Sequence, residues 1–263
     1  MDYSGATRVL YIVGDPIAQV KSPAGVTEAL RARGADLVVV PAHVAPPDFA
    51  AWIAATTTMR NCDGIIVTVP HKFAALPLCI EASAQARSIG AANVMRRDAG
   101  GAWFGDMLDG AGYVSGLRKL GFDPHGKTAL LVGAGGAGSA IAHALVDAGV
   151  AALALHDGDE SRREALAQKL ARYGAVKPAR GSADPGGFDL VINATPMGMK
   201  ADDPLPIDVE RLSPATFVGD VVTKPAIPPL IAAARARGCT TMTGTHMFEA
   251  VRDRMVEFFL SKP

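Results

Sequence analysis

Residues 128–141 read T-A-L-L-V-G-A-G-G-A-G-S-A-I and carry the clearest structural signal in the chain. The first five residues form an apolar run of β type, and an apolar helical pattern follows the last glycine. Between them, Gly133, Gly135 and Gly138 stand in G-x-G-x-x-G spacing. The first glycine permits a tight turn, the second lets the backbone approach a pyrophosphate, and the third lets helix and strand pack closely. Because the motif joins a strand to a helix, it predicts a dinucleotide-binding domain of Rossmann type.

The backbone amides of this glycine loop are the expected binding groups. At a helix N-terminus they point outward and attract an anion such as a pyrophosphate. The alternative is a glycine-rich turn that binds nothing. We expect cofactor contacts from the whole loop, that is from Gly133, Ala134, Gly135, Gly136 and Ala137.

An acidic residue, Asp157, follows the next apolar run. At that place a carboxylate can accept hydrogen bonds from both ribose hydroxyls and repels a 2′-phosphate, which favours NAD over NADP. NADP is not excluded, because Arg162 and Arg163 are close enough in sequence to hold a phosphate. Asp159 can share the ribose role, and either aspartate can instead cap the helix expected near Ser161.

The run that ends at 192 is followed by Asn193-Ala194-Thr195-Pro196-Met197-Gly198. In open parallel sheets, ligands bind at the carboxyl ends of the strands. We therefore expect Asn193, Thr195 and Met197 to line the ribose and nicotinamide, with ordinary loop residues as the alternative.

Strand-like and helix-like segments alternate along nearly the whole chain, which favours an α/β fold with mostly parallel sheets. We expect strands at 9–13, 37–40, 64–69, 128–132, 152–155, 190–192 and 217–222. Helices are expected at 22–33, after 47, at 73–88, towards 120, and at 139–148, 161–173, 229–237 and 247–260. These elements predict two αβ domains: a substrate-binding and catalytic domain, 1–108 completed by 245–263, and a Rossmann domain, 109–244.

Composition excludes several classes of function. The chain has 263 residues, of which 49% are hydrophobic and 20% charged, and its formal net charge is zero. This balance favours neither nucleic acid nor an anionic membrane as partner. No apolar run approaches the roughly 20 residues of a membrane span, and the first residues do not resemble a signal peptide. We expect a cytoplasmic protein with reduced, scattered cysteines and no metal site.

Two further segments resemble parts of an active site. V-T-V-P-H-K places Lys72 just beyond an apolar strand, and G-D-M-L-D-G places Asp109 at the border of the Rossmann domain. Taken singly, such a lysine is usually a solvated surface group and such an aspartate a turn residue.

Together with other segments, they resemble one family closely. The motifs G-D-P-I-A-Q-V-K-S-P, V-T-V-P-H-K, I-G-A-A-N-V, D-M-L-D-G, G-A-G-G-A, I-N-A-T-P-M-G-M, G-D-V-V-T and G-T-H-M occur in this order. In this combination they resemble the shikimate/quinate dehydrogenase family, from Gly14 to about Phe259.

The resemblance implies two αβ domains with the active site in a cleft between them. It implies reversible hydride transfer between a nicotinamide and a ring hydroxyl of a cyclohexane or cyclohexene carboxylic acid, by a monomer or a homodimer. Lys72 and Asp109 would be the catalytic pair. The substrate would contact Ser22, Thr68, Asn93, Thr223 and Met247, and the cofactor would also contact Val221 and Gly244.

The substrate half departs from the family's pattern. Polar side chains that are usual in the family are replaced here by Val20, Ile66, Met107, Leu108, Thr223 and Val251. A pocket that loses hydrogen-bonding partners discriminates poorly for a polyhydroxylated ring. We expect a divergent member that acts weakly on shikimate or quinate, or prefers a less hydroxylated ring acid. The alternatives are a dehydrogenase of another small hydroxy or cyclic acid and an NAD-sensing protein without turnover. His71 and His246, next to site motifs, are expected to be incidental.

Overall fold

The computed structural model describes residues 3–98, 100–174, 176–200 and 202–261. It divides into two compact units, one formed by Met1–Leu108 with Arg252–Pro263 and the other by Asp109–Val251. The last helix, α9 (Gly244–Leu260), begins in the second unit and ends in the first. Residues 245–251, expected in the first domain, therefore group with the second unit, because the helix starts against that unit's own strands.

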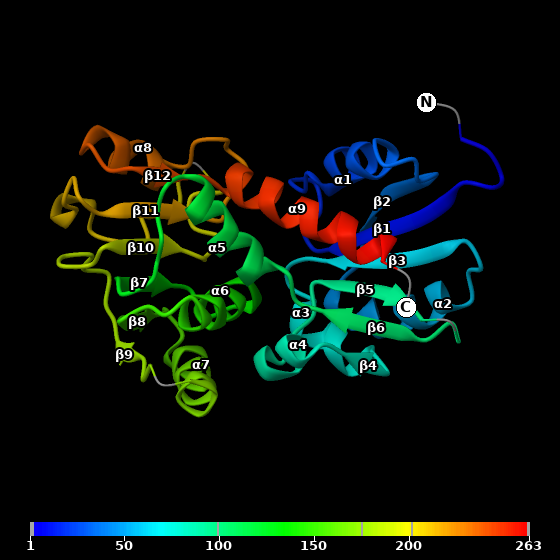
Figure 1. Cartoon of the computed structure of the whole chain (residues 1–263), viewed down its shortest axis with the longest axis horizontal. Helices are drawn as coiled ribbons and strands as arrows, with labels where there is room; N and C mark the ends of the chain where they lie inside the picture. Colours follow the sequence, from blue (N-terminus) through cyan, green and yellow to red (C-terminus); the bar gives the residue numbers. More distant parts are fainter. Residues whose placement is uncertain (1–2, 99, 175, 201, 262–263) are drawn as a thin grey trace. The chain divides into compact units, whose positions relative to one another are not determined.

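The first unit contains a six-stranded mixed sheet in the order β2-β1-β3-β5-β6-β4 (Figure 1). β1 pairs in parallel with β2 and β3, and β4 with β6, whereas β5 is antiparallel to β3 and β6. The strands are β1 (Arg8–Gly14), β2 (Leu37–His43), β3 (Cys62–Val67), β4 (Glu81–Ala82), β5 (Val94–Arg97) and β6 (Trp103–Asp106). The helices are α1 (Ser22–Arg31), α2 (Phe49–Thr57), α3 (Lys72–Ala75) and α4 (Ala84–Ile89), with 3₁₀ turns at Pro46–Asp48 and Leu76–Leu78.

The helix predicted over 73–88 is wrong. The chain forms the short helix α3, a 3₁₀ turn, strand β4 and then helix α4. Pro77 lies within the 3₁₀ turn and has no amide to continue an α-helix, and Cys79 after it is extended. Ser83 then starts α4 afresh, because its hydroxyl accepts a hydrogen bond from the Ala86 amide at 3.0 Å.

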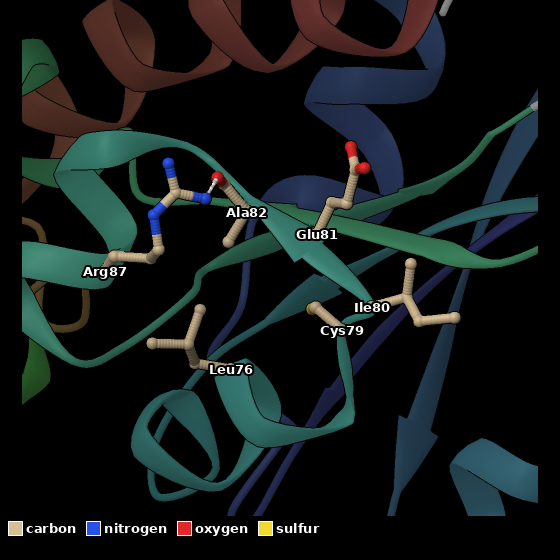
Figure 2. A pocket seen from close by; sticks show the side chains of 6 residues that line it. All are labelled: Leu76, Cys79, Ile80, Glu81, Ala82 and Arg87. Atoms are coloured by element: carbon tan, nitrogen blue, oxygen red, sulfur yellow. Dashed lines mark hydrogen bonds between the residues drawn. The ribbon is translucent and has the colours of Figure 1, made fainter.

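A surface pocket of about 490 Å³ lies where the expected helix is interrupted (Figure 2). The Arg87 guanidinium donates to the Ala82 carbonyl at one side of it. None of the candidate site residues lines this pocket, whose walls are Leu76, Cys79, Ile80, Glu81, Ala82 and Arg87.

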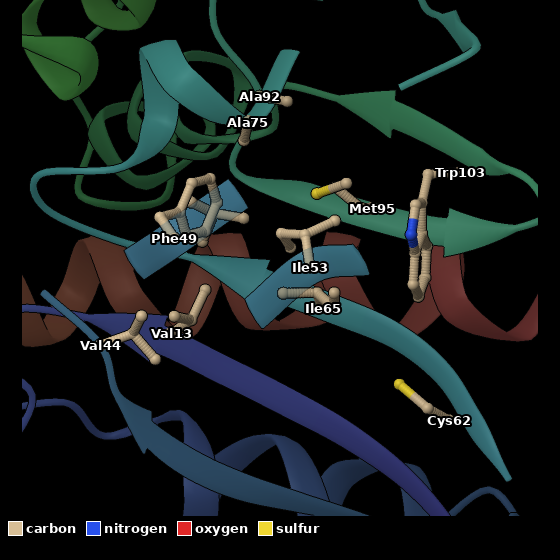
Figure 3. Close-up of a cluster of buried hydrophobic side chains, with 11 residues drawn as sticks. Val13, Val44, Phe49, Ile53, Cys62, Ile65, Ala75, Ala92, Met95 and Trp103 are labelled. Carbon is tan, nitrogen blue, oxygen red and sulfur yellow. The ribbon is translucent and has the colours of Figure 1, made fainter. Parts of the chain in front are cut away.

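A hydrophobic core on one side of the first sheet holds this unit together (Figure 3). Residues from β1, β3 and β5 meet Phe49 and Ile53 of α2 and Trp103 of β6. The Arg97 guanidinium lies 4.8 Å from the Trp103 ring centroid and donates to the carbonyls of Thr56 and Cys62. The end of α2 is thereby fixed to the sheet.

The second unit contains a six-stranded parallel sheet in the order β9-β8-β7-β10-β11-β12. Numbered from the first strand of the unit, this is the Rossmann order 3-2-1-4-5-6. The strands are β7 (Thr128–Val132), β8 (Ala152–His156), β9 (Ala179–Arg180), β10 (Leu190–Asn193), β11 (Phe217–Asp220) and β12 (Thr241–Met242). The helices are α5 (Asp109–Lys119), α6 (Gly136–Asp147), α7 (Glu160–Tyr173), α8 (Pro229–Ala236) and the first part of α9, with a 3₁₀ turn at Val209–Arg211.

This topology fixes where a ligand is expected in the second unit. The strand order reverses between β7 and β10, and ligands of such sheets bind at the carboxyl ends of the strands beside that point. The glycine loop follows β7, and the Asn193–Met197 segment follows β10. The two predicted cofactor segments therefore lie on either side of the reversal.

Other classes of site find little support in the part of the chain that the structure describes. There, no group of three or more His, Cys, Asp or Glu side chains is arranged to hold a metal ion. Among those residues, no helix is both long and apolar enough to cross a membrane. The cysteines are free, and burial raises the pKa of Cys62 and Cys79 to about 11. Both are therefore uncharged thiols at neutral pH.

Candidate functional site

Two of the three motif glycines are required by the fold itself. Gly133 has φ +106°, and a Cβ there would lie 2.8 Å from the Ala194 carbonyl carbon. A Cβ on Gly138 would overlap the Gly133 carbonyl oxygen. These two positions let the glycine loop close onto α6 and onto the segment that follows β10.

Gly135 differs from them. It has φ −71°, caps the N-terminus of α6, and a Cβ there would meet nothing within 4 Å. The protein's own packing therefore does not require a glycine. A bare backbone at a helix N-terminus is what a bound pyrophosphate requires. The glycine loop accordingly fits a dinucleotide, with Gly135 and Gly136 as the residues that would approach its phosphates.

Asp157 lies directly after β8 and reaches back to the glycine loop. One carboxylate oxygen accepts from the Ala134 amide at 2.6 Å, and the other accepts from the Asp159 amide at 2.8 Å. Asp159 caps α7, because its carboxylate accepts from the Ser161 and Arg162 amides. The structure thus separates the two aspartates: Asp159 takes the capping role, and Asp157 stands at the loop.

Both arginines that offered a phosphate site already have acidic neighbours. Arg162 lies 3.2 Å from Asp159, and Arg163 lies 3.0 Å from Glu164. The Arg163 side chain is only 9% exposed. Neither guanidinium is placed as an unopposed positive charge for a 2′-phosphate.

The segment after β10 is held by its own hydrogen bonds. Asn193 is buried, and its side-chain oxygen accepts from the Thr195 amide at 3.0 Å and hydroxyl at 2.6 Å. Its side-chain nitrogen donates to the Met197 carbonyl at 3.1 Å. Thr195 is half-buried and its methyl group lies beside Gly133, whereas the Met197 side chain is 38% exposed.

Two residues that the sequence interpretation did not single out lie behind this segment. Asp220 ends β11, is fully buried, and accepts from Asn193 Nδ2 at 3.2 Å and from the Val222 amide at 2.8 Å. Tyr113 of α5 is also fully buried. Aspartate as the last residue of the apolar strand F-V-G-D was the available signal, since a carboxylate is rarely buried without purpose.

The residues expected near the end of β11 come together with the start of α9. Gly244 is buried, and a Cβ there would lie 2.5 Å from the Val221 carbonyl oxygen. A glycine is therefore needed at residue 244 for the close approach of α9 to the backbone that follows β11. Thr223 is half-buried and Met247 is buried one helical turn into α9.

In the first unit, the carboxyl ends of β1 and β3 meet. A Cβ on Gly14 would overlap the Thr68 methyl group, and the Asp15 amide donates to the Val69 carbonyl at 2.9 Å. Ser22 is buried at the first residue of α1, and the N-cap position before it is held by Lys21.

Lys72 is half-buried and begins α3. The Lys72 carbonyl accepts from the Ala92 amide at 2.9 Å. Asn93, which follows Ala92, is buried. The Asn93 side-chain oxygen accepts from the Leu108 amide at 2.8 Å. Residues 92–93 therefore tie the Lys72 backbone to the segment that immediately precedes Asp109.

Asp109 is buried at the first residue of α5 in the second unit. The glycine after it has a packing role, because a Cβ on Gly110 would overlap the Ala140 carbonyl oxygen of α6. The D-G dipeptide thus fixes the start of α5 against the helix that follows the glycine loop.

Both histidines named from the sequence have structural contacts. His71 is buried, stacks on Phe49 at 4.3 Å between ring centroids, and lies 2.8 Å from the Val44 carbonyl oxygen. His246 Nδ1 lies 3.2 Å from the Thr243 amide nitrogen and helps to start α9.

Comparisons with known proteins bear on the identity of this arrangement. Residues 12–95 match the family model for the shikimate dehydrogenase substrate binding domain. The shikimate dehydrogenase (NADP(+)) of Acidiphilium cryptum is 39% identical over 247 residues, which cover 94% of this chain and 88% of that protein. The chain belongs to the shikimate dehydrogenase family.

Solved structures of shikimate dehydrogenase relatives agree. The quinate dehydrogenase of Corynebacterium glutamicum in complex with NAD is 33% identical, with a TM-score of 0.86 over 97% of this chain and 94% of that one. The ligand-free 5-ketofructose reductase of a Gluconobacter strain is 28% identical, with a TM-score of 0.83 over 97% and 93%. The predicted family and α/β fold are confirmed, and the chain is an NAD(P)-dependent oxidoreductase.

Three of the six residues expected to depart from the family's pattern lie in the interior. Ile66, Met107 and Val251 are each at most 4% exposed. Ile66 pairs with Ile12 of β1 and Val94 of β5, and the Val251 side chain packs on Gly112. Val20, Leu108 and Thr223 are half-buried.

Proposed function

We propose that this protein catalyses reversible, NAD-dependent hydride transfer to and from a ring hydroxyl of a cyclohexane or cyclohexene carboxylic acid. The second unit would bind the cofactor and the first unit the substrate. The observation that carries the proposal is the glycine loop, where Gly135 stands open at a helix N-terminus and Asp157 borders it through the Ala134 amide.

The preference for NAD is argued from charge. Asp157 is held at the glycine loop by two amide donors, so its carboxylate stays where a ribose would lie. A 2′-phosphate placed there would meet a negative charge, and Arg162 and Arg163 are engaged with acidic partners. The nicotinamide supplies or accepts the hydride when it is bound.

Lys72 would accept the proton of the substrate hydroxyl during oxidation and return it during reduction. A positioned amine of this kind can contribute about 10²–10⁴-fold to the rate. Asp109 would assist by orienting the hydroxyl and the ammonium. The Ala92 amide holds the Lys72 backbone, and Asn93 holds the backbone before Asp109, so both groups start from fixed chain segments. Thr68 and Ser22 would contact the substrate from the ends of β3 and α1.

The substrate would be less hydroxylated than shikimate. Ile66, Met107 and Val251 stand where the resemblance implies polar side chains, and their apolar side chains offer a ring hydroxyl no hydrogen-bonding partner. A ring hydroxyl desolvated without a partner costs about 1–3 kcal/mol. A site without these polar groups therefore favours a ring with fewer hydroxyls.

A second candidate is a dehydrogenase of another small hydroxy or keto compound. The similarity to the Gluconobacter 5-ketofructose reductase favours it, because that protein is named for a different substrate.

Steady-state kinetics decide between these candidates. Shikimate, quinate, less hydroxylated ring acids and 5-ketofructose would be assayed with NAD and with NADP. We expect the highest kcat/KM with NAD and a sparsely hydroxylated ring acid, and a loss of about 10²–10⁴-fold in Lys72→Ala. An efficiency with shikimate above about 10⁵ M⁻¹s⁻¹, as in a good metabolic enzyme, would refute the altered substrate preference. A Lys72→Ala rate near that of the wild type would remove Lys72 from the mechanism.

A further inference from the structure

Three buried polar side chains of the second unit meet behind the segment that follows β10. Asn193 and Asp220 are direct partners in the parallel register of β10 and β11. Tyr113 belongs to α5, and a Cβ on Gly219 would overlap its hydroxyl, so the missing side chain of Gly219 makes room for it next to Asp220. The exposed fractions are 1% for Asn193 and 0% for Asp220 and Tyr113.

The cluster contains polar atoms that the fold does not satisfy. Asp220 Oδ2 and the Tyr113 hydroxyl are buried without a hydrogen-bond partner within the described residues. Buried polar atoms are nearly always paired, and an unpaired one costs stability. Retaining a carboxyl group here therefore calls for a benefit that outweighs its cost.

The benefit that we consider is the hydrogen bond that the other oxygen, Asp220 Oδ1, makes with Asn193. Asp220 Oδ1 accepts from Asn193 Nδ2 at 3.2 Å, which fixes the orientation of the Asn193 amide. The Asn193 oxygen is then directed to the Thr195 amide and hydroxyl, at 3.0 and 2.6 Å. The Thr195 hydroxyl accepts in turn from the Met197 amide at 3.1 Å. Asn193 Nδ2 also donates to the Met197 carbonyl at 3.1 Å. Asn193 thus sets the backbone of residues 193–197, and Asp220 anchors the Asn193 side chain from the interior.

This backbone is part of the wall of the glycine loop. A Cβ on Gly133 would lie 2.8 Å from the Ala194 carbonyl carbon and 2.9 Å from the Thr195 methyl group. A Cβ on Gly138 would lie 3.4 Å from the Ala194 methyl group. Any displacement of residues 194–195 therefore shifts the surface on which the proposed cofactor site is built.

We propose that Asp220 is a positioning residue for the nicotinamide cofactor: through Asn193 it holds residues 194–197 against the glycine loop. It touches no ligand itself. The inference rests on the proposed cofactor site and extends it to a residue behind that site.

The acid performs this role most simply as a neutral group. Burial raises the pKa of Asp220 to about 7, while donation from Val222, Asn193 and Val221 opposes that rise. Among the described residues, no charged side chain contributes to this rise in the pKa of Asp220. The titratable group beside Asp220 is the Tyr113 hydroxyl, whose own pKa is raised by burial and by Asp220. A neutral acid has the same shape and acceptor oxygen as an amide, so asparagine is expected to replace it.

The test compares truncation, a conservative replacement and a matched control. Asp220→Ala removes the acceptor for Asn193, and Asp220→Asn keeps it. Asp189→Ala is the control: Asp189 precedes the same strand β10 at its opposite end, where it accepts from the Thr128 amide at 2.8 Å and hydroxyl at 3.0 Å. The dissociation constant of NADH, KM for NAD, kcat and the melting temperature would be measured for each variant.

We expect Asp220→Ala to raise the NADH dissociation constant and KM for NAD by about tenfold or more, with a smaller change in kcat. Asp220→Asn should stay within about threefold of the wild type, and Asp189→Ala should lower the melting temperature without weakening NADH binding. Asp220→Ser, a milder truncation, takes the place of Asp220→Ala if that variant does not fold.

Two negative results are distinguishable. If the wild type does not bind NADH, the proposed function fails. If the wild type binds NADH and a folded truncation at Asp220 binds it equally well, or no more weakly than Asp189→Ala, only the positioning role is overturned.

Discussion

Asp157 and Asp159 stand two positions apart and serve different purposes because a strand ends at one and a helix begins at the other. Asp157 accepts from the Ala134 amide of the glycine loop, whereas Asp159 accepts from the first amides of α7. Capping stabilises a helix wherever it occurs, but a carboxylate at the loop acts only on what binds there. Asp159 therefore caps a helix, whereas Asp157 holds the glycine loop at the proposed cofactor site.

Asp157→Asn should weaken the discrimination against NADP. The amide keeps an acceptor oxygen for the Ala134 N–H, gives up the acceptor for the Asp159 N–H, and removes the negative charge that opposes a 2′-phosphate. We expect the ratio of kcat/KM for NADP to that for NAD to rise by about tenfold, or roughly 1.4 kcal/mol. Asp159→Ala is the control: it should cost about 1 kcal/mol of stability through the lost cap and leave this ratio unchanged. An unaltered ratio in Asp157→Asn would place cofactor discrimination elsewhere.

Asp220 should make the stability of the protein depend on pH. Its pKa is about 7 in the folded protein against an ordinary value of 3.8, so the folded state holds this proton more tightly than the unfolded state. The stability contribution is complete below about pH 4 and is lost as the pH rises through 7. Since a pKa difference of one corresponds to about 1.4 kcal/mol, the change amounts to roughly 4 kcal/mol at most.

Asp220→Asn cannot titrate and provides the comparison. The free energy of unfolding of the wild type relative to this variant should fall between pH 4 and pH 7 and become constant above about pH 8. Urea denaturation at several pH values measures it. A relative stability that rises with pH would mean that Asp220 is stabilised as a carboxylate.

At the scale of elements, two glycines of the glycine loop, Gly135 and Gly138, differ in the space that a side chain would have. Gly138→Ala should destabilise the second unit by about 1–3 kcal/mol or prevent its folding, because the methyl group overlaps the Gly133 carbonyl. Gly135→Ala has open space and should cost less than about 1 kcal/mol, the scale of an N-cap change. We expect it to weaken NADH binding by about tenfold or more, because the methyl group stands where the phosphates approach.

Thermal unfolding and NADH titration of these two variants separate the roles. Wild-type NADH affinity in Gly135→Ala would show that the open space at residue 135 is not used by the cofactor.

Elements with strong local patterns were predictable from the sequence. The apolar runs of β1, β3, β7, β8, β10 and β11 and the helices from α5 to α9 were expected close to their observed bounds. β5 and β6 were not expected, because their four-residue runs include Arg96, Arg97 and Asp106 and show no sustained alternation. The antiparallel pairing of these strands, and with it the mixed first sheet, depends on contacts distant in sequence.

The site shows the same division. Glycine spacing and the residues after strands are local signals, so the segments that follow β7 and β10, including Asn193 and Thr195, could be singled out from the sequence. The cluster of Tyr113, Asn193 and Asp220 was not, because it joins α5, β10 and β11, and only the fold brings these elements together. Likewise, nothing local indicates that the Asn93 oxygen is used by the Leu108 amide.

At the scale of the whole molecule, the end of α9 completes the first unit from the far end of the chain. The Arg96 guanidinium lies 4.9 Å from the Phe258 ring centroid and donates to the Phe258 carbonyl at 3.0 Å. Phe259 fills the space that the missing side chain of Gly64 leaves on β3. The packing of β3 and β5 in the first unit therefore depends on residues at the end of α9.

Phe258→Ala should destabilise the first unit by about 3 kcal/mol, as expected for a buried aromatic ring. Hydrogen exchange is expected to speed up in β5 and β6 and to stay unchanged in β7 and β10. Phe122→Ala, which removes a ring whose centroid lies 4.9 Å from that of Phe217, is the comparison variant in the second unit and should show the opposite distribution. Equal acceleration in both units would show that they unfold as one cooperative body.

The parallel sheet of the second unit ends on both sides in very short strands. β9 and β12 contain two residues each, so each edge exposes only a brief row of unpaired backbone groups. Long, flat edges are templates onto which other chains add strands and aggregate, and short ones give such a chain little to pair with. The short strands β9 and β12 thus protect the two edges of this sheet against pairing with other chains during folding, when many copies are present at once.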